Sequence, residues 1–424
     1  MTRTFLFTAA GVMLAVSAGP ALAQYQDASR AAPQTPPPAP PSAAEEPAQP
    51  SAGIRPSKGA MKAFVELQKA VNANDTANIP AKVAAAQAVA TTPQDKYLLA
   101  QFQLKIAAAA HDIPGEAAAI DAIAASGLIE QDKLSRLYRG LGGAYYNAKQ
   151  FDRAAAAFDR AIALNAGDIE SMKLLGNARF AQGQNAQAAA AFQKAIQAST
   201  AAGQKPEEDL FKRGVQTAYD AKLPAAMDLS RAWVAAYPSP ESWRNAIAIY
   251  RNTSRQDVEG TLDLLRLMRA AGALTTPGDY MLYATSAADQ LNYNEAKAVV
   301  DEGVAAKRID PAKPDFRDLI AALKKKPIAT AADLATATSN AKNGMAVLRI
   351  GDRYYALRDY AKAADSYRKA KGQSGVDADV ANIHLGMALA AAGDKAGATA
   401  AFKAVTGTRA GIAQLWLVYL QTHA

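Results

Sequence analysis

The residue types that most often carry out chemistry are sparse and scattered in this chain of 424 residues. Cysteine is absent, which excludes a thiol nucleophile, a disulfide framework and a cysteine-ligated zinc ion. The three histidines, His111, His384 and His423, lack the spacing of metal ligands or of a catalytic base. We therefore interpret each histidine as a surface or packing residue, and we predict no catalytic residue, no metal and no cofactor.

Other stretches that suggest chemistry have simpler structural interpretations. Motifs for phosphate binding, zinc proteases, nucleophile elbows and dinucleotide binding are absent from the sequence. Glu207 and Glu208 stand at an expected helix start, where carboxylates meet the positive end of the helix dipole. The run from Lys324 to Lys326 could contact an anionic lipid or polymer, but a solvated helix end before Pro327 explains it more simply.

From about residue 59 onward, apolar residues recur with helical periodicity and without a convincing alternating strand. A shift of 34 residues superimposes the sequence around Gly142 on that around Gly176, and a shift of 35 relates Gly351 to Gly386. Each unit has a glycine on its first helix, then a small residue and an aromatic residue one turn apart on its second helix. We predict that these residues pack the repeats: Gly142, Ala154, Phe158, Gly176, Ala188, Phe192, Gly351, Ala363, Tyr367, Gly386, Ala398 and Phe402.

This pattern resembles the tetratricopeptide repeat (TPR) family, whose 34-residue unit carries Leu-Gly, Tyr, Ala and Phe at fixed positions. The match is clear in residues 135–168 and 169–202, and returns in 344–377 and 379–412. The resemblance implies an all-α fold in which antiparallel helix pairs stack into a right-handed superhelix, or solenoid. The units between 203 and 310 are degenerate.

The chain divides by composition into five predicted segments. A basic start, an apolar run and a small-residue site ending at Ala23 predict a signal peptide, cleaved after Ala23, and export to the bacterial periplasm. Nine of the 21 prolines lie between Pro33 and Pro56, which predicts a disordered tether because proline removes backbone donors. The segments are a signal peptide (1–23), a Pro/Ala-rich linker (24–58), a first repeat block (59–310), a connector (311–342) and a second block with a capping helix (343–424).

The resemblance further implies a concave groove lined by the first helix of each unit. Family members that clamp a peptide carboxylate use a Lys and an Asn four residues apart on that helix, and Lys173 and Asn177 match this pair. Lys212 replaces the Asn expected on the next unit, so the clamp is incomplete. The predicted groove residues, taken by helical phase, are Arg136, Arg139, Tyr146, Asn147, Lys173, Asn177, Phe180, Lys212 and Tyr219.

The formal net charge of +8 is spread along the chain and is not concentrated with aromatic residues, so we predict no nucleic-acid partner. We predict a non-catalytic scaffold of the cell envelope, without a transmembrane span after signal removal, that binds a protein or peptide. An acidic partner fits the basic excess, and charge reversal at Arg139 and Lys173 is expected to weaken its capture with little loss of thermal stability. Two alternatives stay open: a subunit of a secretion, outer-membrane or polysaccharide-export assembly, and a cell-wall or polysaccharide enzyme on a helical scaffold.

Overall fold

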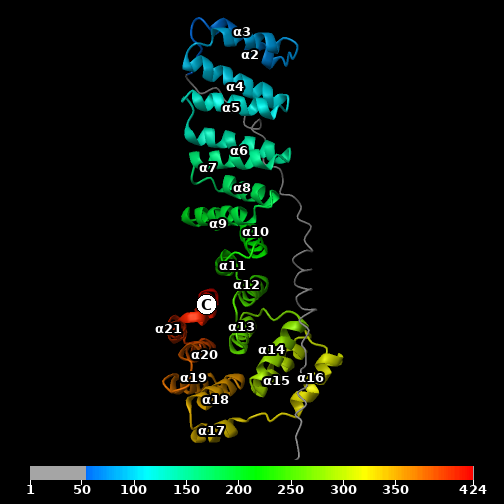
Figure 1. Cartoon of the computed structure of the whole chain (residues 1–424), viewed down its shortest axis with the longest axis vertical. Helices are drawn as coiled ribbons and strands as arrows, with labels where there is room; N and C mark the ends of the chain where they lie inside the picture. Colours follow the sequence, from blue (N-terminus) through cyan, green and yellow to red (C-terminus); the bar gives the residue numbers. More distant parts are fainter. Residues whose placement is uncertain (1–53, 424) are drawn as a thin grey trace, which may run out of the picture. The chain divides into compact units, whose positions relative to one another are not determined.

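The computed structural model describes residues 54–423, and within this range every regular element is a helix (Figure 1). The predicted signal peptide and most of the predicted linker fall in residues 1–53, which lie outside the described residues, as does residue 424. The described part contains 21 α-helices, α2 to α22, and one short 3₁₀ helix, η1 (Gly407–Arg409). The prediction of an all-α repeat fold is confirmed.

Most helices form pairs joined by short turns, and each pair packs on the next along the chain (Figure 1). The first seven pairs are α2 (Met61–Asn72) and α3 (Ile79–Val89), α4 (Pro93–Ala109) and α5 (Ile113–Ala125), α6 (Gln131–Asn147) and α7 (Phe151–Leu164), α8 (Ile169–Ala181) and α9 (Asn185–Ala201), α10 (Glu208–Asp220) and α11 (Ala225–Ala236), α12 (Pro240–Thr253) and α13 (Val258–Ala270), and α14 (Pro277–Asp289) and α15 (Tyr293–Ala305). The remaining helices are α16 (Pro314–Lys324), α17 (Ala331–Asn340), α18 (Gly344–Ala356) paired with α19 (Tyr360–Lys371), α20 (Ala378–Ala391) paired with α21 (Lys395–Lys403), and α22 (Ala410–Thr422).

The turn inside a pair repeats one backbone conformation. Between α6 and α7, Lys149 has a φ of 59°, and the next backbone N–H, of Gln150, donates to the carbonyl of Tyr145 at 2.9 Å. This left-handed residue closes the helix by satisfying a carbonyl that would otherwise lack a partner. The same position has a positive φ in six further pairs: His111, Gly183, Lys222, Leu291, Arg358 and Gly393.

A close contact between a glycine and an aromatic ring holds each pair of the clear repeats together. A Cβ atom added to the glycine would lie 2.5–2.6 Å from a ring carbon of the aromatic residue on the second helix, so no larger residue fits without movement. The four rings and the alanine one turn before each of them are buried. The contacts join Gly142 to Phe158, Gly176 to Phe192, Gly351 to Tyr367 and Gly386 to Phe402.

The hydrophobic core is organised differently in the two halves of the described chain. One core cluster runs from Ala60 to Ala178, and a second runs from Met172 to Ile249, so each involves consecutive pairs. A third cluster extends from Val234 to Leu420 and takes in residues from α11 to α22. The predicted connector, 311–342, therefore lies within a shared core: it folds into α16 and α17 and buries Phe316, Leu323 and Leu334.

The predicted capping helix, α22, packs on α21 and also contacts α11 and α13. Gly411 lies directly against the ring of Tyr250 in α12, where a side chain would collide with it. Trp243 of α12 packs edge-to-face on Tyr419, with ring centroids 6.1 Å apart. Because of these contacts, the second block returns to the first and closes a unit that spans α11 to α22.

Because of the glycine–aromatic contact, even a methyl group in place of the glycine hydrogen should lower the stability of the fold. We expect Gly176→Ala to lower the free energy of unfolding by about 1–3 kcal/mol, because the methyl group overlaps the ring of Phe192. Gly59→Ala is the matched control, since a Cβ at Gly59 has no neighbour within 4 Å. Urea unfolding measures both variants, and equal stability of the two would contradict this packing.

Candidate functional site

The nine predicted groove residues all lie on three first helices, α6, α8 and α10, of consecutive pairs (Figure 1). Helices α6 and α8 contact each other directly. Side chains link α8 to α10, because Nη1 of Arg213 donates to Oδ1 of Asn177 at 3.2 Å. Several of the predicted groove residues on α6 and α8 are exposed or half-buried, among them Arg136, Asn147, Lys173 and Phe180. The face that these residues share is therefore open along the described stack.

Each of the helices α6, α8 and α10 has one aromatic residue among the predicted groove residues. Phe180 of α8 is 37% exposed, and it is the one aromatic side chain among the large apolar residues that are exposed in residues 54–423. Tyr146 of α6 is half-buried and meets the ring of Phe151 edge-on at a centroid distance of 5.3 Å. Tyr219 of α10 is half-buried, and its hydroxyl accepts a hydrogen bond from Nδ2 of Asn252 at 3.1 Å.

Arg213 of α10, which is the neighbour of the predicted Lys212, connects this face to α8. Its Nε donates to Asp209 at 2.6 Å, while its Nη1 reaches the buried amide of Asn177. Burial raises the pKa of the Tyr146 hydroxyl, and the charge of Arg213 partly offsets that rise. Arg213 therefore bonds to α8 and influences α6 through its charge.

The two predicted groove lysines are paired with carboxylates of the same chain. Nζ of Lys173 lies 3.2 Å from Glu170 and 3.3 Å from Glu207. Lys212 lies 3.6 Å from Glu208, and its Nζ is 5.6 Å from the ring centre of Trp233. Exposed ion pairs of this kind contribute about 0–1 kcal/mol each, so a partner's carboxylate can replace them.

Arg139 has a structural contact that the sequence did not reveal. Its Nη1 donates at 2.8 Å to the buried carboxylate of Asp168, which also caps α8 through the N–H of Ser171. Burial favours the neutral acid, but the bonds from Ser171 and Arg139 hold the pKa of Asp168 below its ordinary value. Charge reversal at Arg139 would place two carboxylates together, so we revise the expectation that it spares thermal stability.

Comparison with known proteins adds little sequence information. No protein-family model matches the chain, and no curated protein matches it in sequence. Among solved structures, YrrB, described as a TPR protein with an unusual peptide-binding site, matches 47% of this chain and 96% of its own. The identity is 19% and the TM-score is 0.30. The glycine–aromatic contacts and paired helices seen here are those of the TPR pattern. This is a TPR-like fold.

The second helical block holds the other unusual group of polar side chains, centred on His384 of α20. Its imidazole is fully buried. Nε2 lies 3.0 Å from Oδ1 of Asp263 in α13, and Nδ1 lies 2.8 Å from Oδ1 of Asp352 in α18. The second contact is an ion pair without hydrogen-bond alignment. His384 therefore joins the two helical blocks, since α13 belongs to the first and α18 to the second.

Arginines surround this histidine and balance the carboxylates. Arg266 forms two hydrogen bonds with Glu295, at 2.9 and 2.8 Å, and a third with Asp263 at 3.0 Å. Arg349 reaches from the second block to Glu259 at 2.9 Å. Buried charges are tolerated only when they are paired in this way, and removing one partner leaves a costly unpaired charge.

The neighbouring carboxylates keep His384 charged. Burial alone would favour the neutral ring, but Asp352 and Asp263 outweigh it and raise the pKa of His384 to about 10. Burial likewise opposes ionisation of Asp352, yet His384 and Arg266 hold its pKa well below the usual range. At neutral pH the group is therefore an ionised cluster, in which the carboxylates of Asp263 and Asp352 are negative and the imidazole of His384 is positive.

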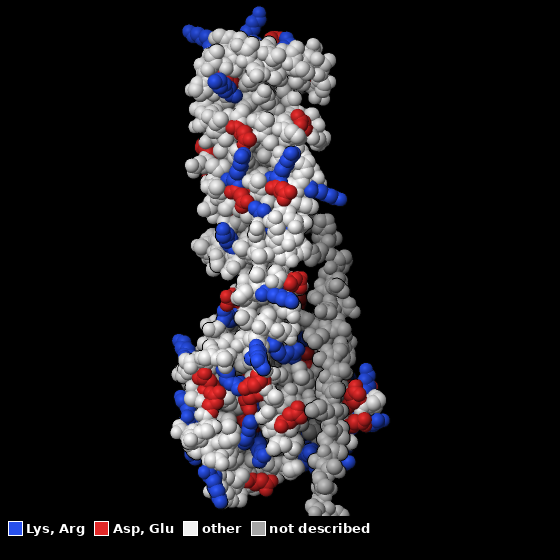
Figure 2. Space-filling model, in the orientation of Figure 1, with Lys and Arg blue, Asp and Glu red and all other residues white. Residues whose placement is uncertain are grey.

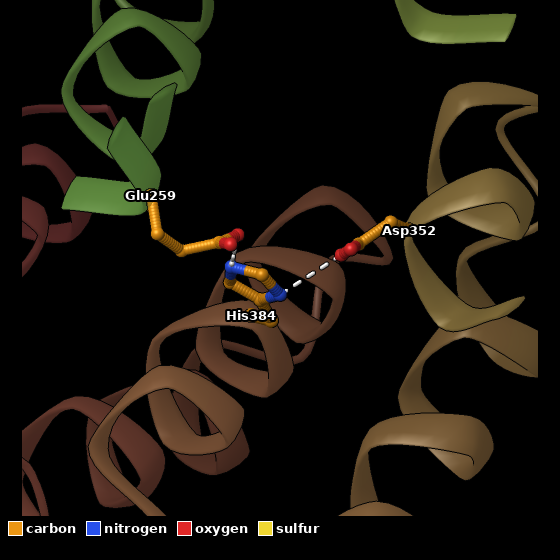
Figure 3. Close-up of side chains that lie close together, drawn as sticks. All are labelled: Glu259, Asp352 and His384. Atoms are coloured by element: carbon orange, nitrogen blue, oxygen red, sulfur yellow. Dashed lines mark ion pairs between the residues drawn. The ribbon is translucent and has the colours of Figure 1, made fainter. Parts of the chain in front are cut away.

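Glu259, Asp352 and His384 lie close enough together, by distance alone, to suggest a metal site (Figure 3). The two carboxylates approach opposite nitrogens of the imidazole: Glu259 is 3.5 Å from Nε2, and Asp352 is 2.8 Å from Nδ1. A single ion could not use both nitrogens of one ring. Nη1 of Arg266 also lies 3.1 Å from Nε2. The geometry is that of an imidazolium held between carboxylates and does not fit a metal ion.

Sequence reasoning missed this cluster because its members are far apart in the chain. Asp263 and His384 are separated by 121 residues and share no repeat position. A buried histidine with charged partners also leaves no periodic signal.

The raised pKa of His384 predicts how stability depends on pH. The ordinary histidine pKa is about 6.5, so the stabilisation is complete below about pH 6.5 and is lost as the pH rises through about 10. We expect His384→Gln to lower the free energy of unfolding by about 3–5 kcal/mol at pH 6.5, because Asp263 and Asp352 lose their shared cation. The difference between the two proteins should shrink steadily toward pH 10.

Chemical denaturation at several pH values between 6 and 10 measures this difference. His111→Asn is the control, because His111 is exposed in a left-handed turn position that asparagine tolerates. A stability difference for His384→Gln that stays constant from pH 6 to pH 10 would show that the histidine is neutral in the folded protein.

Proposed function

We propose that the protein is a non-catalytic scaffold that binds an extended peptide of a partner protein in the groove of α6, α8 and α10. The observation that carries this proposal is the exposed Phe180, which stands between Tyr146 and Tyr219 on consecutive first helices. An exposed aromatic ring beside two half-buried ones offers apolar contact at little conformational cost.

Polar groups in the same groove suit the peptide backbone and an acidic side chain. Arg213 has a fixed planar set of donors, and its ion pair with the exposed Asp209 can be exchanged for a partner's carboxylate. Lys173 and Lys212 can exchange their exposed glutamates for a partner's acidic residue. These features support a partner that combines apolar residues with one or two carboxylates.

A catalytic role finds no support in the described residues. His384, whose pKa is strongly shifted, is fully buried within the ionised cluster and cannot meet a substrate. The groove itself holds lysines, arginines and carboxylates in exposed pairs and lacks a histidine. On the face shown in Figure 2, positive and negative side chains are interspersed, which fits a scaffold better than a site for a highly charged polymer.

The proposal includes export to the periplasm, which rests on the N-terminal sequence. The basic start, the short apolar run and the small residues before Gln24 have the order of a secretory signal. Within residues 54–423, no helix combines the length and apolar character needed to cross a bilayer. A role within a larger envelope assembly would use the same groove to hold another subunit.

Truncating Phe180 should weaken peptide binding. A random peptide library displayed on phage and selected on the full chain should yield ligands that compete with one another for one site. We expect Phe180→Ala to weaken these ligands by about tenfold, because a buried aromatic contact contributes roughly 1–2 kcal/mol or more. Met345→Ala, which truncates an exposed residue of α18, is the control. Ligands that bind both variants equally would place the binding site elsewhere.

Export makes a separate prediction about the N-terminus. When the chain is produced in a bacterium with a periplasm, mass spectrometry of the periplasmic fraction should find a protein that begins at Gln24. An intact Met1 in the recovered protein would refute processing at this site.

A further inference from the structure

Helix α16 and the turns on either side of it carry a local excess of positive charge. Residues 305–327 contain seven Lys or Arg residues against three Asp residues, which is a net charge of +4. This short segment thus carries a charge equal to half of the +8 of the whole chain, so the charge is more concentrated than we predicted. The seven cations are Lys307, Arg308, Lys313, Arg317, Lys324, Lys325 and Lys326.

Most of these cations have no partner of opposite charge in the described chain. Arg317 pairs with Asp318 at 3.0 Å, and Nζ of Lys326 lies 5.3 Å from the ring centre of Tyr293. The other five cations are exposed and form no ion pair with any residue in 54–423. The two groove lysines, by contrast, each have two carboxylates as partners. The segment therefore presents charge that the protein itself does not neutralise.

The cations near the start of α16 border a cavity of about 450 Å³ between this helix and the end of α15. Lys307, Arg308 and Lys313 line the cavity beside apolar side chains that include the buried Phe316. The one carboxylate in the lining, that of Asp310, accepts a hydrogen bond from a backbone N–H two residues further on, at 2.9 Å. A cavity with this lining suits an anionic group that is attached to an apolar body.

The three lysines at the end of α16 are held on a fixed turn. The backbone N–H of Lys326 donates to the carbonyl of Leu323 at 3.0 Å. Just beyond, the backbone of Ala329 forms two hydrogen bonds with the buried side chain of Asn294, at 2.8 and 3.0 Å. Ile328, which lies between the lysines and this anchor, is 40% exposed. At this end of α16 too, cations stand beside apolar surface.

The distance between the two groups of cations limits what can bind both. From Lys313 to Lys324 the helix rises about 16 Å, so one small anion cannot contact both groups. A partner that contacts both must present several anions over a surface, with apolar atoms close beneath them. A bilayer that contains anionic phospholipids has both properties, and clusters of about four to eight Lys or Arg residues are typical of proteins that bind one. A solvated helix end would account for the lysines at one end of α16, but not for the cations at the other.

We propose that the cationic surface of α16, made of Lys307, Arg308, Lys313 and Lys324 to Lys326, binds the surface of a bilayer that contains anionic phospholipid. The ammonium and guanidinium groups contact the lipid phosphates, and the cavity and Ile328 contact the apolar atoms next to the headgroups. The inference goes beyond the proposed function, since the groove of α6, α8 and α10 takes no part in it. The scaffold is then held at a membrane while its groove binds a peptide.

Vesicle flotation with the full chain tests this surface. The protein should float with vesicles of phosphatidylglycerol and phosphatidylcholine more than with pure phosphatidylcholine, which accounts for binding by apolar parts that all variants share. A lysine near an anionic bilayer contributes about fivefold in affinity, so replacing Lys324, Lys325 and Lys326 together with Gln should weaken binding to the anionic vesicles at least tenfold. Replacing Lys307, Arg308 and Lys313 with Gln should have a similar effect.

The matched control removes the same charge from other helix ends. Lys369 and Lys371 in the last turn of α19 and Lys403 in that of α21 are exposed, and replacing all three with Gln should leave vesicle binding unchanged. Circular dichroism should show the same helical content in every variant. An equal loss in the control would overturn the proposal by reducing the effect to net charge.

Two further results would also overturn it. One is an unchanged chain that floats equally with both kinds of vesicle. The other is binding of polyglutamate that requires Lys324 to Lys326 without any preference for anionic vesicles, because the surface would then serve an acidic protein. Phe180→Ala should bind vesicles as the unchanged chain does, and the lysine variants should still bind the library-derived peptides, so the two proposals can fail separately.

Discussion

Close approach of two helices at a residue without a side chain is the constraint on which the rest of this structure depends. At Gly142, Gly176, Gly351 and Gly386, the ring of an aromatic residue occupies the space that a Cβ atom would fill. This contact fixes how near the second helix of a pair lies to the first, and therefore how the next pair can stack. The stacking of α6 and α8, whose pairs both have this contact, follows from that repeated distance.

Helix pairs of the same kind are packed differently in the two halves of the described chain. In the first half, the core joins neighbouring pairs, and the faces of the first helices stay open. In the second half, α22 packs on α13, and Asp263 and Arg266 of α13 form buried ion pairs with each other, with His384 of α20 and with Asp352 of α18. In the second block, these contacts with the first block cover the inner face of the helices. The face of α6, α8 and α10 stays open, and it is the one that we propose for a partner.

Much of the fold could be predicted because its contacts are local and periodic. The sixteen-residue interval between Gly142 and Phe158 recurs in each clear repeat, so the sequence itself indicates helix, turn and helix. The ionised cluster could not be predicted, since Asp263 and His384 meet only when distant pairs return to one another. Arg213 was missed for a different reason: its unit is degenerate, and Gly214 has only aliphatic and Cβ neighbours at 3.4 Å or more in place of a tightly packed ring. Such a unit leaves the helical phase uncertain by one residue.

The contact of α22 with α11 and α13 also bears on how the protein is made. Pairs in the first half can form one after another as the polypeptide emerges during synthesis, because each needs only its predecessor. Helices α12 and α13 must wait for residues 410–422 before Tyr250 and Trp243 find their neighbours. Until then, the apolar surface around Tyr250 and Trp243 is uncovered, and transiently exposed surface of this kind is prone to aggregation.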